Sequence, residues 1–85
     1  MDSNVKSSIH EQIVTTWLNG DDRGFDDNTD LQGTGILDSF STLSLVAFID
    51  DTFHVQLDPV DINAETFKSV TTIAELVSSK INSIQ

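Results

Sequence analysis

The stretch that decides the fold is GILDSFSTLSLVAFIDDTF, residues 35–53. Its apolar residues recur at helical spacing, and the serine that precedes them is of a type favoured at helix N-caps. We therefore predict a helix over residues 39–53, with Ser39 as its N-cap. The apolar positions cover more than half of its circumference, so this helix is expected to be the most buried one. These positions are Phe40, Leu43, Leu45, Val46, Ala47, Phe48, Ile49 and Phe53.

Two amphipathic helices are predicted on either side of this stretch. Residues 4–18 carry apolar side chains at helical spacing, and the Asn19-Gly20 pair that follows is typical of a helix end. The last helix is predicted to begin with a capping box formed by Thr72 and Glu75. Its apolar stripe consists of Ile73, Val77, Ile81 and Ile84. Each of the two helices therefore has one face for a shared core.

The connections between these helices differ in character. Residues 20–38 form a long polar loop, and a loop of this length is usually functional. Four apolar residues are expected to pin it to the core: Phe25, Leu31, Ile36 and Leu37. Farther on, Pro59 prevents a continuous helix, and Asp61 is predicted to cap a short helix over residues 62–67. The sequence thus predicts an all-α fold, a small four-helix bundle with a long first loop and a short third helix, in a single domain of residues 1–85.

The composition excludes several classes of function. Fourteen acidic residues and four basic residues give the 85-residue chain a net charge of −10, which disfavours binding to nucleic acids and anionic membranes. There is no cysteine, so disulfides, thiolate metal sites and cysteine nucleophiles are excluded. No apolar run reaches the roughly 20 residues of a membrane span. Because the first residues also lack an apolar signal-peptide core, we expect a cytoplasmic protein.

An aspartate-rich part of the long loop invites comparison with calcium-binding loops. Asp26, Asn28 and Asp30 match the first three ligand positions of an EF-hand. However, Leu31 and Leu37 stand where that motif requires its glycine and its bidentate glutamate. We therefore predict no metal site.

Ser39 has two further candidate roles, as a catalytic residue and as a phosphate-bearing residue. A hydrolase would pair Ser39 with His10 or His54, but the flanking residues do not form a G-x-S-x-G turn, so we do not expect a hydrolase. A phosphate ester on Ser39 would benefit from the free N–H groups and partial positive charge of a helix N-terminus. Position alone favours the simpler interpretation, a serine that only caps the helix.

The segment Gly35-Ile36-Leu37-Asp38-Ser39-Phe40, followed by Leu43, Leu45-Val46 and Asp50-Asp51-Thr52-Phe53, resembles the acyl carrier protein family. In that family a G-x-L-D-S-[L/F/M] stretch opens the second helix. The expected helix order, the acidic charge and the length agree with the family over almost the whole chain. The resemblance implies that Ser39 is esterified with 4′-phosphopantetheine. It also implies that Asp38 helps a transferase and its metal ion to engage this serine.

The same resemblance implies a recognition face on the second helix. Leu43 and Ala47 match exposed apolar positions of that face, and Asp50 and Asp51 match acidic positions that meet basic patches on partner enzymes. An acyl chain would shelter in a cleft lined by Leu43, Val46, Leu57 and Ile62, although core packing explains these residues equally well.

Some positions depart from the fatty-acid carriers. Those carriers have acidic residues two and five positions after the serine, where this chain has Ser41 and Ser44. Phe40 and the Thr42–Val46 continuation look more like carriers of D-alanine or of specialised biosynthetic pathways. A housekeeping role in fatty-acid synthesis is therefore not expected.

The resemblance implies a stand-alone, monomeric, non-catalytic carrier that holds an acyl or aminoacyl group as a thioester on the arm. The implied partners are a phosphopantetheinyl transferase, an acyl- or aminoacyl-loading ligase or synthase, and downstream acyl transferases or condensing enzymes. The alternative is an acidic helical protein-interaction module without a prosthetic group, in which Ser39 is only a cap.

Overall fold

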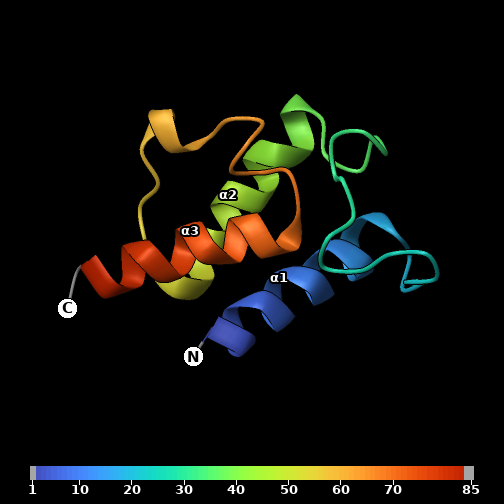
Figure 1. The fold of residues 1–85 in the computed structure, drawn as a ribbon, viewed down its shortest axis with the longest axis horizontal. Helices are drawn as coiled ribbons and strands as arrows, with labels where there is room; N and C mark the ends of the chain where they lie inside the picture. The colour runs from blue at the N-terminus through green and yellow to red at the C-terminus, as the bar shows by residue number, and fades with distance from the viewer. Residues whose placement is uncertain (1, 84–85) are drawn as a thin grey trace.

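The computed structural model describes residues 2–83, and within this range all regular secondary structure is helical. The elements are α1 (Asp2–Trp17), α2 (Ser39–Phe53), the three-residue 3₁₀ helix η1 (Pro59–Asp61) and α3 (Val70–Ser83). α1 and α3 pack against each other, and α2 passes behind α3 in the view of Figure 1. The predicted all-α class is confirmed, but the described residues form three α-helices rather than the predicted four. None of these helices is both long and apolar enough to cross a membrane.

One hydrophobic core joins the three α-helices. Its buried residues are Val5, Ile9 and Ile13 on α1, Leu45 and Ile49 on α2, and Val70, Ile73, Ala74 and Val77 on α3. The connections add Leu31, Leu37, Val55, Leu57 and Phe67. The predicted apolar stripes of α1 and α3 therefore face this core, except that Ile84 lies outside the described residues.

α2 is not the most buried helix, contrary to the prediction. It buries only Ser41, Leu45 and Ile49, whereas α3 buries four residues. Phe40 and Leu43 are 78% and 61% exposed. α2 thus has two stripes, since positions 41, 45 and 49 face the core and the apolar residues at positions 40, 43 and 47 face outward. Burial of one stripe leaves the other available for contacts with partners.

The predicted helix over residues 62–67 does not form. Pro59 begins η1 instead, and residues 63–67 form turns. The side-chain oxygen of Asn63 accepts hydrogen bonds from the backbone N–H groups of Glu65 and Thr66 at 2.9 and 3.0 Å. The Thr66 hydroxyl donates to the Asp61 carbonyl. Asn63 thus caps a single turn, closed by the Phe67 N–H donating to the Asn63 carbonyl at 3.1 Å, and the chain does not continue it as a helix.

α3 begins two residues before the predicted capping box. The Ser69 backbone N–H donates to Thr72 Oγ1 at 3.0 Å, and the Thr72 N–H donates to Ser69 Oγ at 3.3 Å. A reciprocal capping arrangement is therefore present, but Ser69 and Thr72 form it rather than Thr72 and Glu75.

The long loop is attached to the core, as predicted. Leu31 and Leu37 are buried, and Phe25 and Ile36 pack against the core while partly exposed. The Leu31 N–H also donates to the Lys68 carbonyl at 2.7 Å, just before α3. These contacts fix the direction in which the loop enters α2, and therefore the position of the serine at its start.

Lys80 of α3 ties down the segment that contains η1. Its Nζ lies 2.9 Å from Asp61 Oδ2 and 3.6 Å from Asp58 Oδ2. The ammonium group of Lys80, and next the N–H of Asp58, hold the pKa of Asp61 below its ordinary value of 3.8. The carboxylate in turn raises the pKa of Lys80.

This pair is expected to make stability depend on acid pH. The pKa of Asp61 is lower in the folded state than in the unfolded state. Its contribution to the free energy of unfolding is therefore complete at pH values above the ordinary pKa of 3.8. It is lost as the pH falls through the folded-state pKa. Lys80→Met should therefore lower the melting temperature at pH 7, and the difference from wild type should shrink below about pH 4. Lys68→Met, at an exposed lysine, is the matched control. Melting curves between pH 7 and pH 2 that run parallel for wild type and Lys80→Met would contradict this assignment.

Candidate functional site

Ser39 is the first residue of α2 and is exposed. The N-cap is Asp38 and not Ser39, contrary to the prediction: Asp38 has extended backbone angles, and its Oδ1 accepts the Ser41 N–H at 2.8 Å. The Asp38 carbonyl accepts the Thr42 N–H at 2.9 Å. Within residues 2–83 no hydrogen bond occupies the Ser39 hydroxyl. Because Asp38 caps the helix, the serine oxygen is available for chemistry.

The carboxylate beside Ser39 is ionised at neutral pH. The backbone N–H of Ser41, together with the Ser41 hydroxyl, holds the pKa of Asp38 below its usual range. A helix N-terminus also carries a partial positive charge, which favours anions. The site therefore presents a free hydroxyl next to a fixed negative charge, at a helix end that stabilises a phosphate group.

A surface groove of about 540 Å³ opens beside Ser39. One wall comes from the start of α2 and from Gln32, and the other from residues 62–64. Its lining residues are Gln32, Asp38, Ser39, Thr42, Leu43, Ile62, Asn63 and Ala64. Of the residues predicted to line an acyl cleft, Leu43 and Ile62 lie here. Val46 and Leu57 are absent from this lining: Leu57 belongs to the buried core, and Val46 packs against it.

The predicted recognition residues lie on the outer side and far end of α2. Ala47, Asp50 and Asp51 are exposed and line a second surface depression near the end of the helix. Phe40 precedes them on the same exposed stripe, next to Ser39. Phe40 is one of the apolar positions from which the sequence predicts α2 to be the most buried helix, and its exposure contradicts that prediction. The signal for its exposure was its spacing of three from Leu43 and seven from Ala47.

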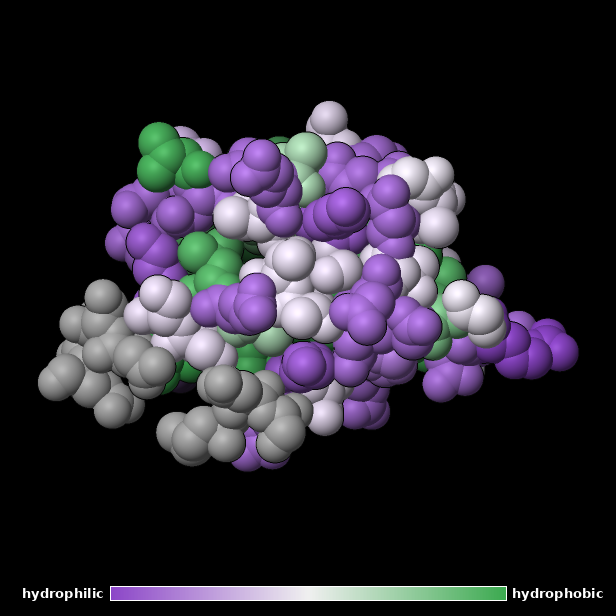
Figure 2. Space-filling model, viewed as in Figure 1, coloured by the Kyte–Doolittle hydropathy of each residue, from purple (hydrophilic) through white to green (hydrophobic). Residues whose placement is uncertain are grey.

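Most of the face shown in Figure 2 is hydrophilic, with a small hydrophobic patch over η1. Val60 of η1 is 80% exposed. Since Ile62, two residues later, lines the Ser39 groove, this patch lies on the segment that forms one groove wall.

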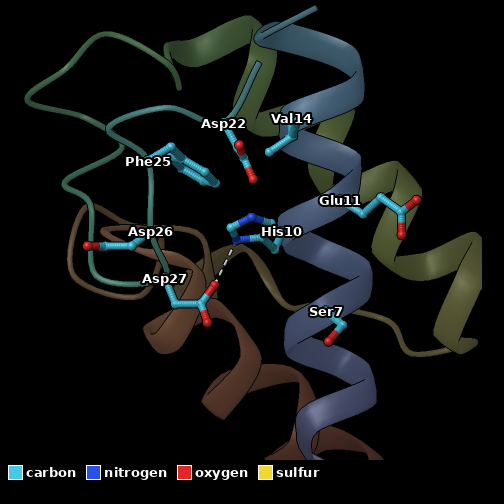
Figure 3. A pocket seen from close by; sticks show the side chains of 8 residues that line it. All are labelled: Ser7, His10, Glu11, Val14, Asp22, Phe25, Asp26 and Asp27. Carbon is cyan, nitrogen blue, oxygen red and sulfur yellow. Dashed lines mark hydrogen bonds and ion pairs between the residues drawn. The ribbon is translucent and has the colours of Figure 1, made fainter. Parts of the chain in front are cut away.

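A cavity of about 560 Å³ lies elsewhere, between α1 and the long loop (Figure 3). His10 Nδ1 forms a 2.9 Å hydrogen bond with Asp27 Oδ1, and the Phe25 ring lies 4.8 Å from the His10 ring. The Asp27 carbonyl also accepts the Thr71 N–H of α3 at 3.0 Å. The bond between His10 and Asp27 therefore joins the loop to α1, and the Asp27 backbone joins it to α3. This cavity shares no lining residue with the Ser39 groove.

The other residues weighed as chemical groups have local roles. His54 is the left-handed C-cap of α2, at the opposite end of a 15-residue helix from Ser39. Asp26 Oδ1 accepts the Asn28 N–H, and Asp30 Oδ1 accepts the Gly33 N–H. These aspartates therefore stabilise turns of the loop. Among the described residues, no group of three or more His, Asp or Glu side chains is placed to hold a metal ion.

Comparison with known families gives a match. A family model described as "Phosphopantetheine attachment site" matches residues 11–78, which include Ser39 and its groove. No curated protein matches the chain in sequence. Members of this family carry 4′-phosphopantetheine covalently on a serine, are generally non-catalytic carriers, and interact with phosphopantetheinyl transferases and synthetic enzymes. The match covers most of the chain, which therefore belongs to the phosphopantetheine attachment site family.

Proposed function

We propose that the chain is a carrier of acyl or aminoacyl groups and that Ser39 bears its phosphopantetheine arm. The observation that carries the proposal is the position of the N-cap. Asp38 caps α2, so the exposed Ser39 hydroxyl in the first turn has no structural task. A serine that is free, exposed and next to a groove fits covalent attachment better than a purely capping role.

The surroundings of Ser39 suit a phosphodiester. The N-terminus of α2 stabilises its negative charge, as helix N-termini do for phosphate groups in general. Asp38 is ionised and adjacent, and we assign it the task of engaging the transferase and its metal ion. The groove beside Ser39 provides room for the arm to fold back, so that the arm and its cargo lie against the protein.

When bound, the arm supplies a terminal thiol that holds the cargo as a thioester. This chain has no cysteine, so no internal thiol competes for that thioester by exchange. The role of the protein is to tether the cargo at high effective concentration and to present it to successive enzymes. The proposed partners are a phosphopantetheinyl transferase, a loading ligase or synthase, and downstream acyl transferases or condensing enzymes.

We assign partner recognition to the outer stripe of α2. Leu43 and Ala47 provide exposed apolar contacts, and Asp50 and Asp51 provide negative charge. Phe40 extends this stripe to the attachment site. A basic partner surface with a small apolar centre is complementary to this combination.

The test is intact-mass spectrometry after incubation with coenzyme A, Mg²⁺ and a broad-specificity phosphopantetheinyl transferase. One phosphopantetheine adduct, accompanied by one new thiol, is the expected result. A folded protein that acquires no adduct with this enzyme or with others of its class would favour the interaction module without a prosthetic group.

Modification by the transferase is expected to depend on charge at the far end of α2. Because electrostatic steering acts on association rates, Asp50→Asn with Asp51→Asn should lower kcat/KM about 3- to 10-fold at low salt. The difference should vanish at high salt, where such charges are screened. Glu11→Gln with Glu75→Gln changes the net charge equally at exposed positions on α1 and α3 and serves as the control. Equal losses for the two double variants would show that only net charge matters.

A further inference from the structure

Polar and apolar side chains share the lining of the Ser39 groove. Gln32, Asp38, Ser39, Thr42 and Asn63 contribute polar side chains, and Leu43, Ile62 and Ala64 are apolar. An alkyl chain lying in this groove would remove polar groups from water without offering them hydrogen bonds, which offsets the gain from burying methylenes. A group with hydrogen-bonding atoms of its own would satisfy the same lining.

The apolar interior is closed to a chain that enters from the groove. Leu45 on α2 and Phe67 at the end of the connection have no exposed surface. The groove wall itself is held in place, because the Asn63 side chain bonds to Glu65 and Thr66, and its Nδ2 donates to the Val60 carbonyl at 2.9 Å. A long alkyl chain would have to displace packed core side chains, which protein interiors resist.

The charge of the groove further limits which cargo it accepts. Asp38 is the one ionised residue in the groove lining, and it is negative. With a chain net charge of −10, the groove favours cationic or neutral cargo and repels anionic cargo. This inference rests on the proposed carrier function. We propose that the cargo held against this groove is a short polar acyl group of the aminoacyl class, and that the groove does not bury a long alkyl chain.

The experiment loads Ser39 with defined arms, using a transferase and the coenzyme A thioesters of acetate, β-alanine, succinate and octanoate. Intact mass confirms each loading. The readouts are the melting temperature, the backbone amide shifts of the groove residues, and the rate of thioester cleavage by hydroxylamine. We expect the β-alanyl form to shift the amides of Gln32, Thr42 and Asn63 relative to the acetyl form. The succinyl form should show no such shifts. The octanoyl form should melt like the acetyl form and be cleaved at its rate, within about twofold.

A groove variant shows that the test can detect burial of an octanoyl chain when the groove allows it. Gln32→Leu with Thr42→Val keeps similar side-chain volumes but removes polar groups, so the octanoyl form of this variant should melt several degrees higher than its acetyl form. Thr52→Val with Gln56→Leu makes related changes at exposed positions outside the groove and should show no octanoyl effect.

The outcomes separate the two proposals. Wild type that accepts no arm refutes the carrier function. Wild type that accepts the arm, but whose octanoyl form is stabilised and protected from hydroxylamine, keeps the carrier function and overturns the aminoacyl inference. An octanoyl effect absent from wild type and present in the groove variant supports the inference.

Discussion

Ser39→Ala is expected to abolish attachment of phosphopantetheine completely while the protein stays folded. The substitution removes the hydroxyl oxygen to which the proposal attaches the arm. Stability should change by less than about 0.5 kcal/mol, as for other surface substitutions, because Asp38 and not Ser39 caps the helix. Intact mass after the transferase reaction, with circular dichroism before it, measures both effects.

Ser44→Ala is the matched control for this experiment. Ser44 is an exposed serine on the same helix, so the variant loses the same atom five positions away. It should be modified to the same extent as wild type. An adduct on Ser39→Ala, or its loss from Ser44→Ala, would move the attachment site to another residue.

Phe67→Ala is expected to cause the largest loss of stability. Phe67 has no exposed surface, and replacing a buried phenylalanine with alanine costs about 3–5 kcal/mol. A chain of this length has a total stability of roughly 4–13 kcal/mol, so this loss is a large fraction of the total. Urea unfolding followed by circular dichroism measures the free energy of unfolding directly.

Phe40→Ala makes the same chemical change at a side chain that is 78% exposed. It should alter the free energy of unfolding by no more than about 0.5 kcal/mol. If both phenylalanine variants lost similar stability, the outward orientation of Phe40 and its assignment to the recognition stripe would be wrong.

The helices themselves were largely predictable from the sequence. α2 spans the predicted residues because an uninterrupted apolar pattern follows two residues that both favour N-caps. The choice between Asp38 and Ser39 as N-cap was not predictable, since it depends on backbone angles and both residue types suit the position. The division of α2 into a buried and an exposed stripe depends on how much of the helix its neighbours cover. The apolar pattern of α2 alone does not give that information.

The tertiary parts of the site required the structure. The groove joins the start of α2 to residues 62–64, where a predicted helix is replaced by turns around Asn63. Similarly, the bond between His10 and Asp27 links residues seventeen positions apart. The proposed attachment serine could be chosen from the sequence alone, because the motif that marks it consists of residues adjacent in the chain.

Asp38 both caps α2 and neighbours the serine, which has a consequence for whether unfolded chains are modified. Because short helices are marginal in isolation, the first turn of α2, which the Asp38 carboxylate caps, depends on the fold. A transferase that requires this turn distinguishes native from unfolded molecules without any separate inspection. Chains damaged in the core would then accumulate unmodified, and the modified fraction in a cell would be a record of how much of the protein had matured correctly.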